Sequence, residues 1–442
     1  MADLSQLETC FRELSSAIQS FITHSHHVAF PVQSSGINPT RVTTPDSSNG
    51  ACRARELALA NLTRLQIMLF EPGDFLQQLA LQTQLLACIQ WLGEFQVPAC
   101  IPMDGSALMK DVSDLIGVPE TQLGRIVSVA SLGGFLQEAK PGHVAHSPLS
   151  AAFVAKPSYL DAAMFLADKA APAAWKMAAA TKQVRDSPQK AQEVMFHEGI
   201  FANAEKSELP RLQRQWRAYL RYGLGHHCDT ATDILTCLGT SQIGAGSLVV
   251  EVGARSTERV LELANKYPCY RLIAQMSSTA SIPSSISSNG TPAPKLRHPR
   301  IQVQYRDPGT PQPIEDASIY IINFPLPEPG ATWTSLMAEL DSELRAHLSV
   351  LHKRPTATLV LTAPALPERG TIHADPGIES RLRDLSLMQL ANEREHEMSE
   401  VIGLLNGMGN SEGRLVLVNK VRSRGRGGAV ALEIKYQVYP DQ

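Results

Sequence analysis

The feature that most limits the possible folds of this chain is an alternation of short apolar runs with amphipathic segments, which begins at Gly246 and continues to the end. Such runs predict buried strands, and helices between them predict a doubly wound parallel sheet of the α/β, Rossmann-like class. We expect strands at 246–252, 270–276, 301–305, 317–323, 357–361, 414–421 and 430–439, the last in an antiparallel edge hairpin, and helices at 257–266, 334–352 and 380–407.

The N-terminal part is predicted to be all-helical. Apolar residues from Leu4 to Phe21 recur at intervals of three and four, which predicts a helix whose seam packs against its own chain or a second copy. Further helices are expected at 53–70 and 74–95, the latter capped by Asp74 and apolar on most sides. The candidate dimer or partner surface comprises Leu7, Phe11, Leu14, Ile18, Leu85 and Trp91.

Residues 106–154 show the order helix, tight turn, helix and short hairpin, which predicts a winged helix. Gly117 forms the first turn, Gly133 and Gly134 end the second helix, and a turn at 140–142 joins the two hairpin strands. The inward faces of the two helices are assigned to Val112, Leu115, Ile116, Leu123, Ile126, Val127 and Leu132.

The outward face of this winged helix offers few groups for DNA. Recognition requires side chains for base edges and cations for the flanking phosphates. Candidate DNA or partner contacts are Lys110, Gln122, Arg125 and Ser128, opposed by Glu120. The whole chain has 40 basic against 43 acidic residues, which disfavours autonomous DNA binding. Dimerisation is the alternative role for this module.

Four regions follow from these patterns. We expect an amphipathic helix at 1–22, a polar flexible linker at 23–50, a helical dimerisation and winged-helix domain at 51–157, and the α/β domain at 158–442 with a helical connector to about 238. The 7 scattered cysteines contain no C-x-x-C pair, so we expect no zinc ribbon, no Zn₂Cys₆ cluster and no metal site. No secretory signal and no membrane-spanning run is expected.

A winged-helix part followed by this α/β domain resembles the fungal and plant S-adenosylmethionine-dependent O-methyltransferases. The resemblance implies a glycine-rich turn after the first strand and a ribose-binding carboxylate at the end of the second. The matching positions here are Glu251, Gly253, Ala254, Arg255 and, on the second strand, Gln275. Added side chains crowd the turn and an amide replaces the carboxylate, so we expect a vestigial site that holds no cofactor.

The catalytic base implied by this resemblance is also missing. It would be a histidine in a His-Asp-Trp-like motif after the strand at 318–323, where it would take the proton of the acceptor hydroxyl. This chain continues instead with a proline-rich loop, and only Trp333 echoes the motif. We expect His347, His352 and His373 to be surface residues, and we expect no catalytic residue.

A narrower resemblance covers nearly the whole chain. The segments LLACIQWLGEFQV at 85–97, ACIP at 99–102 and PGHVAHS at 141–147 are very similar to the aflatoxin-cluster regulatory coactivators of the AflJ (AflS) type, with looser similarity at 429–434. The resemblance implies a nuclear (also cytoplasmic) transcriptional coactivator of a fungal aromatic-polyketide cluster. It also implies a cluster-specific Zn₂Cys₆ partner of the AflR type, which supplies the DNA contacts.

The leading hypothesis is therefore a homodimeric coactivator on a catalytically inert methyltransferase scaffold, with no membrane partner. One alternative is an active O-methyltransferase that modifies a polyketide phenol. Another is a scaffold adapted to a pericyclic or dehydration step. Loss of a coactivator silences a whole cluster, whereas loss of an enzyme leaves one intermediate to accumulate.

Overall fold

The computed structural model describes residues 4–27, 49–186, 208–225, 244, 246–254, 257–277, 298–325, 333–364, 377–391, 394, 397–422 and 429–439. The chain divides into two compact units. Unit 1 comprises Met1–Lys182 with Ala204–Gly223, and unit 2 comprises Gln183–Asn203 with Leu224–Gln442.

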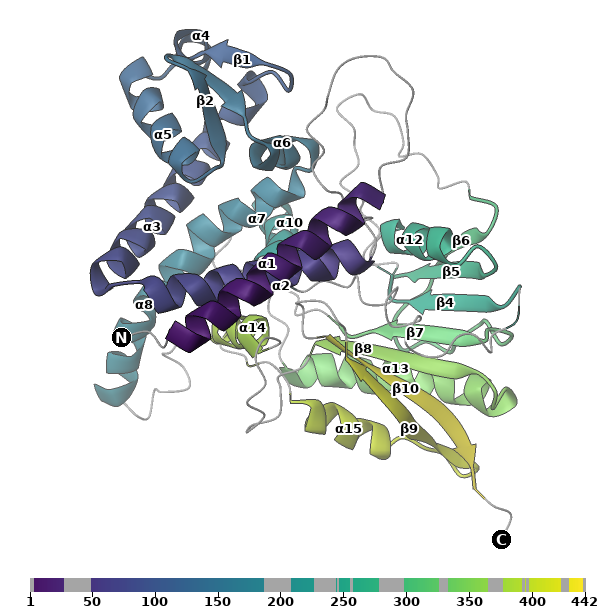
Figure 1. Ribbon diagram of the computed structural model, residues 1–442. Coiled ribbons are helices and arrows are strands. Elements are labelled where there is room, and N and C mark those ends of the chain that lie inside the picture. The colour runs from purple at the N-terminus through teal and green to yellow at the C-terminus, as the bar shows by residue number, and fades with distance from the viewer. Residues whose placement is uncertain are drawn as a thin grey trace. The chain divides into compact units, whose positions relative to one another are not determined.

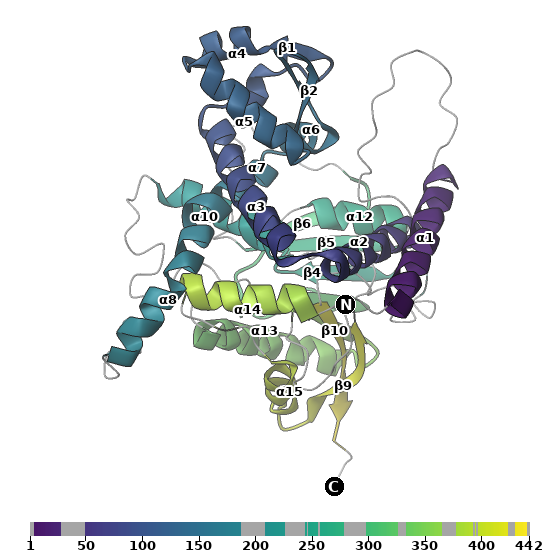
Figure 2. The ribbon, with the colours of Figure 1, turned by 60° about the vertical axis from the view of Figure 1, so that its left-hand side comes forward.

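Unit 1 begins with two helices, α1 (Leu4–His27) and α2 (Asn49–Leu69), which pack side by side (Figure 1 and Figure 2). Small buried side chains line their contact, which allows the two axes to approach closely: Cys10, Ala17, Ala51 and Ala54. The pair therefore buries only part of the apolar surface of α1.

Helix α1 continues five residues beyond the end expected at residue 22. Thr23 Oγ1 donates to the Gln19 carbonyl at 2.9 Å and His24 Nδ1 lies 2.7 Å from the Ser20 carbonyl, so these polar side chains bind backbone groups of the preceding turn. Of the linker expected at 23–50, residues 28–48 lie outside the described residues.

Helix α3 (Pro72–Glu94) starts one turn earlier than its expected cap. Glu71 is the N-cap, and Asp74 sits at the third helical position, where its carboxylate accepts the Glu71 backbone N–H at 3.1 Å. This reciprocal arrangement is a capping box, so Asp74 supports the cap rather than forming it. The second half of α3 buries Cys88 and Leu92, whereas its first half is exposed.

A small module follows α3 and has the expected order of helix, turn, helix and hairpin. Its sheet has the strand order β1-β3-β2. Gly117 ends the first helix in the left-handed region with a φ of +70°. The elements are η1 (Val97–Cys100), β1 (Ser106–Leu108), α4 (Met109–Ile116), α5 (Glu120–Leu132), β2 (Leu136–Lys140) and β3 (His143–His146).

Two leucines expected in the core of this module point to solvent. Leu115 is 71% exposed and Leu132 is 78% exposed. In α4 the buried residues Met109, Val112 and Ser113 follow helical spacing, and Leu115 lies off that face. The same geometry places Leu132 outside the buried face of α5.

The remaining helices of unit 1 shift the expected domain boundary. Helices α7 and α10 pack against each other, with the Phe165 ring 5.3 Å from Trp216 and 5.1 Å from Tyr219. The boundary expected at 157/158 therefore falls inside unit 1, because part of the expected connector belongs to this helical core. These helices are α6 (Pro148–Ala155), α7 (Ser158–Phe165), η2 (Leu166–Ala170), α8 (Ala171–Asp186), α10 (Leu209–Ala218) and η4 (Tyr219–Gly223).

Unit 2 contains a seven-stranded sheet of order β6-β5-β4-β7-β8-β10-β9, visible in Figure 1. Strands β4 to β8 pair in parallel, and β10 pairs antiparallel with both β8 and β9. The expected antiparallel hairpin of the last two strands lies at this edge of the sheet, with β9 as the outermost strand. The strands are β4 (Leu248–Val252), β5 (Arg271–Met276), β6 (Ile301–Tyr305), β7 (Ile319–Asn323), β8 (Thr358–Pro364), β9 (Gly413–Arg422) and β10 (Ala429–Val438).

Helices cover both faces of this sheet. Val250 and Val252 join the core beneath α13 (Trp333–Lys353) and α15 (Met398–Asn406), whereas Val249 joins the core beneath α12 (Glu258–Lys266). This alternation is the normal consequence of a strand buried on both faces. In the described part of the chain, no helix has the length and apolar character needed to span a bilayer.

The helix expected at 380–407 is two helices, α14 (Gly377–Ala391) and α15. A second capping box separates them: the Glu400 carboxylate accepts the Glu397 backbone N–H at 3.0 Å, and Glu397 caps α15 in return. A new helix therefore begins inside the range for which a single helix was expected.

A pair of substitutions tests the placement of the small module's core. Leu123 is fully buried, so Leu123→Ala should lower the free energy of unfolding by about 2–5 kcal/mol. Leu115→Ala, the matched control at an exposed site, should change it by less than about 0.5 kcal/mol. Thermal unfolding of both variants measures this, and equal losses would contradict the placement.

Candidate functional site

The carboxyl ends of β4, β5 and β7 form the candidate site, because ligands of doubly wound sheets bind at this edge. Gly253 follows β4 with a φ of +68°, a conformation that favours glycine. Ala254 donates its backbone N–H to the Gln275 carbonyl at 2.8 Å, and its buried side chain joins the core beneath α12. The sequence had predicted that the side chain of Ala254 crowds the cofactor side of the turn, and the structure corrects this, because that side chain points into the core. Arg255 lies outside the described residues.

Glu251 near the end of β4 is almost fully buried, and its negative charge is balanced by Arg259 on helix α12. Arg259 Nη1 from α12 lies 3.1 Å from Glu251 Oε1, and Asn323 Nδ2 at the end of β7 donates to the same oxygen at 3.2 Å. Arg259 Nη1 also donates to Asn323 Oδ1 at 3.1 Å. This arrangement gives Glu251 a structural role that links two central strands and α12.

Gln275 stands where the resemblance implies a ribose-binding carboxylate, and its amide is already satisfied by the protein. Gln275 Nε2 donates to Gln312 Oε1 at 2.8 Å and to Gln304 Oε1 at 3.0 Å. Gln312 Nε2 donates back to Gln275 Oε1 at 2.9 Å, which makes a reciprocal amide pair. Sequence reasoning missed Gln312, because it lies in the segment between β6 and β7 and no local pattern pairs it with β5.

His347 continues this polar network into α13. Its ring is completely buried, which corrects the expectation that it lies on the surface. Nδ1 lies 2.8 Å from the Glu343 carbonyl and Nε2 lies 3.0 Å from Gln312 Nε2, so the hydrogen bonds fit a neutral ring protonated on Nδ1. Burial lowers the pKa of His347 to about 4, the Glu343 carbonyl and carboxylate oppose this, and the Arg306 cation adds to it.

The cavity left at this sheet edge is small. It has a volume of about 50 Å³ and is lined by residues from the ends of β4, β5 and β7, from the segment after β6 and from α13, among them Gly253, Gln275, Arg306, Asn323 and Glu343. Small-molecule sites generally occupy about 300–1,000 Å³. As formed by the described residues, the site does not fit S-adenosylmethionine.

The other residues that sequence analysis associated with catalysis are not gathered here. His352 is half-buried, lies 3.3 Å from Glu412 and packs edge-on against Tyr436. Trp333 begins α13, but its side chain lies outside the described residues, as do His373 and residues 326–332. Among the residues that the structure describes, no cluster of three or more His, Cys, Asp or Glu is arranged for a metal ion.

The candidate DNA or partner contacts all lie at the surface of unit 1. Gln122, Arg125 and Ser128 recur every three residues on α5, and Lys110 is exposed on α4. All four side chains are therefore accessible at the surface of α4 and α5.

The candidate dimer or partner surface is divided by the structure. Leu14 is buried against α2, Leu7 is half-buried, and Leu85 and Trp91 pack against the core of the small module. Phe11 and Ile18 remain 62% and 41% exposed.

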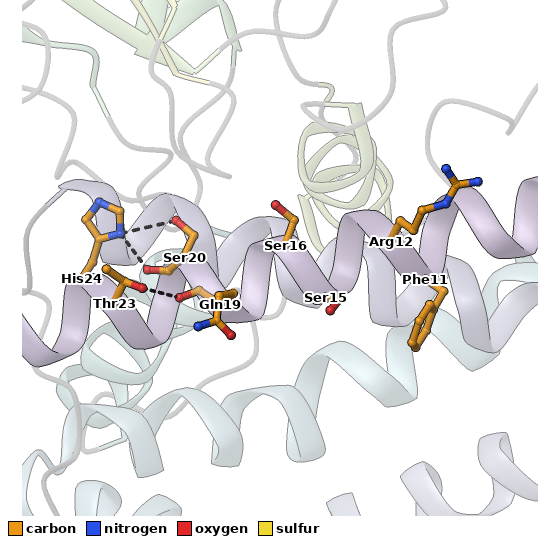
Figure 3. Close-up of a pocket in the computed structure, with 8 residues that line it drawn as sticks. All are labelled: Phe11, Arg12, Ser15, Ser16, Gln19, Ser20, Thr23 and His24. Atoms are coloured by element: carbon orange, nitrogen blue, oxygen red, sulfur yellow. Dashed lines mark hydrogen bonds between the residues drawn. The ribbon is translucent and has the colours of Figure 1, made fainter.

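A shallow groove of about 570 Å³ runs along the outer face of α1 (Figure 3). Phe11 lies towards one end of the labelled residues and His24 towards the other, with small polar side chains between them. Helix α3, expected to be apolar on most sides, leaves the apolar residues of its first half exposed, and no charged residue lies between Asp74 and Glu94.

Comparison with known proteins identifies full-length relatives. The agnestins biosynthesis cluster transcriptional coactivator AgnL9 of Paecilomyces divaricatus is 58% identical, with 100% of both chains covered. The monodictyphenone cluster transcriptional coactivator mdpA of Emericella nidulans is 42% identical over 99% of both chains. The dothistromin biosynthesis regulatory protein aflJ of Dothistroma septosporum is 37% identical, again over 99% of both.

The solved structures that resemble this chain show its fold. A LepI variant in complex with SAH and a substrate analogue has a TM-score of 0.62 at 15% identity and covers 96% of this chain and 100% of its own. The mitomycin 7-O-methyltransferase MmcR has a TM-score of 0.53 at 18% identity and covers 83% of this chain and 98% of its own. The expected methyltransferase-like α/β fold is confirmed.

The family model for the N-terminal domain of the trypacidin cluster transcriptional coactivator tpcD matches residues 4–70, which contain α1 and α2. Together with the full-length relatives, this match confirms the resemblance to aflJ-type regulators. The chain has a methyltransferase-like fold, and it belongs to the family of fungal secondary-metabolite cluster transcriptional coactivators.

Proposed function

We propose that this protein is a transcriptional coactivator of a fungal secondary-metabolite gene cluster and acts by binding other proteins rather than by transferring methyl groups. The observation that carries the second part is the cavity of about 50 Å³ at the sheet edge, where Gln275 is held by Gln312. A methyl donor has no room there beside the described residues.

The retained polar residues support the same conclusion. Glu251 is engaged by Arg259 and Asn323, and Gln275 by two other glutamines. Groups that would contact a cofactor in an active enzyme stabilise the fold here. Relatives over the full length are named as coactivators, which favours this role over methylation of a polyketide phenol.

A partner protein supplies the sequence-specific DNA binding of the complex. A net charge of −3 supplies little general attraction to phosphates. The proposed partner is a Zn₂Cys₆ transcription factor of the AflR type that is encoded in the same cluster. The protein then acts in the nucleus, where that factor binds its promoters.

Deletion of the gene in its host separates the proposed role from an enzymatic one. We expect transcripts of the whole cluster to fall together, because every promoter loses the same coactivator. RNA sequencing with metabolite profiling measures this. Unchanged transcripts with one accumulating intermediate would instead establish an enzyme of the pathway.

The exposed face of the proposed winged helix contributes little direct DNA contact. Arg125→Ala should leave promoter occupancy unchanged in chromatin immunoprecipitation, whereas loss of the Zn₂Cys₆ partner should abolish it. Thr121→Ala, also exposed on α5 but outside the candidate contacts, is the control. If Arg125→Ala alone lowered promoter occupancy while the partner factor stayed bound to the protein, Arg125 would be shown to contact DNA.

We also propose that the protein is a homodimer through α1 and the first half of α3. Phe75, Leu76 and Leu79 lie within about 100° of one another around α3 and are all exposed. Phe11 and Ile18 add a second exposed stripe on α1. Exposed apolar side chains that cluster on one face of a helix segment without charge are typical of a protein interface.

Leu79→Glu tests this dimer. The carboxylate would be buried unpaired in the interface, so the dimer dissociation constant should rise by about 10-fold or more. Gln77→Glu adds the same charge on the opposite side of α3 and should leave it unchanged. Light scattering on the purified chain measures the mass, and a wild-type monomer of 48.1 kDa at micromolar concentration would refute the dimer.

A further inference from the structure

We propose that Gln312 is an internal substitute for the bound nucleoside, and that it keeps the former cofactor site closed by holding Gln275 and His347 from within the chain. This inference rests on the proposed function only in requiring no cofactor. It adds a specific residue that occupies the site and a reason why the scaffold stays folded without a ligand.

The hydrogen bonds around Gln312 are complete. Its two amide hydrogens reach Gln275 Oε1 at 2.9 Å and His347 Nε2 at 3.0 Å. Its carbonyl oxygen accepts from Gln275 Nε2 at 2.8 Å and from the Ile314 backbone N–H at 3.2 Å. No donor of the side chain is left for a ligand, and Gln312 itself is 4% exposed.

Gln275 is saturated in the same way. Its second amide hydrogen is taken by Gln304, which pairs with Gln275 in the β5–β6 register. A ribose that bound at Gln275 would have to displace Gln312 and would strand His347 Nε2 in a buried position. Buried polar groups without partners are costly, so the closed arrangement excludes a nucleoside.

An ion pair fixes the segment that carries Gln312. Arg306 Nη1 lies 2.5 Å from Glu343 Oε1, and the Gly309 backbone N–H donates to Glu343 Oε2 at 2.7 Å. The Arg306 guanidinium also donates to the Thr310 carbonyl. The Gln312 backbone N–H donates to the Ala346 carbonyl of α13 at 3.3 Å. The segment between β6 and β7 is therefore fastened to α13 by backbone and side-chain contacts.

Burial is the main reason that His347 stays neutral, and the groups that face its ring act with it. Gln312 donates to Nε2, Glu343 faces the ring from the same helix, Arg306 approaches from the β6–β7 segment, and the Tyr320 ring packs edge-on at 5.4 Å. A donor at Nε2 and a nearby cation both oppose protonation of this nitrogen. Gln312 thus acts as a positioning residue for the ring.

Gln312→Ala, made in the full chain, tests the proposal. It removes the buried partner of Gln275 Oε1 and of His347 Nε2, while Gln304 and the Glu343 carbonyl stay in place, so the melting temperature should fall by about 3–6 °C. Gln302→Ala is the matched control, because Gln302 lies exposed on β6 and its loss should leave the melting temperature unchanged. Equal melting temperatures for the two variants would overturn the proposal.

A second measurement distinguishes positioning from simple packing. In the wild-type protein the His347 ring should stay neutral down to about pH 5, because its pKa is about 4. In Gln312→Ala the donor to Nε2 is gone and the smaller side chain reduces the burial of the ring, so the pKa should rise and the ring should titrate at higher pH than in the wild-type protein. Histidine NMR signals followed from pH 7 to pH 4 report this, and an unchanged titration would contradict the role of Gln312.

S-adenosylhomocysteine is the probe for closure of the site. Calorimetry and thermal shift should show no binding to the wild-type chain at 1 mM, a concentration of about 1,000 times a micromolar dissociation constant. Micromolar binding would overturn the inference. It would leave the coactivator role intact unless methyl transfer and a single accumulating intermediate were also found, so the two failures are distinguishable.

Discussion

The buried carboxylate of Glu251 sets a constraint on which much of unit 2 depends. It lies in a strand that is covered on both faces, so its charge must be met inside the protein. Arg259 from α12 and Asn323 from β7 meet it. The first helix after β4 is thereby tied to the two central strands, and the sheet edge beyond them acquires a fixed geometry.

Polar side chains at the carboxyl edge of the sheet are also paired with other groups of the protein. In an enzyme of this fold, polar side chains at the strand ends remain available to a ligand. Here Gln275, Gln312, His347, Arg306 and Glu343 contact one another and join β5, the β6–β7 segment and α13.

The sequence predicted the central strands well, because runs such as 248–252 are apolar on both faces and leave no other good solution. The changes at Ala254 and Gln275 were visible for the same reason, since their positions follow from the strands. Gln312 and His347 were not predictable, because their importance comes from contacts 35 to 37 residues apart along the chain. The division of the helix expected at 380–407 into two was signalled by the polar run NEREHE at 392–397 and by Glu400, which completes the capping box with Glu397.

The uncharged surface of α3 has a consequence for the amount of this protein in a cell. A helix that exposes Phe75, Leu76 and Leu79 and carries no charge between Asp74 and Glu94 has little to oppose nonspecific association. If a second copy of the chain covers this helix, as in the proposed homodimer, dimerisation also protects each chain from aggregation, and the protected fraction falls as the protein becomes dilute.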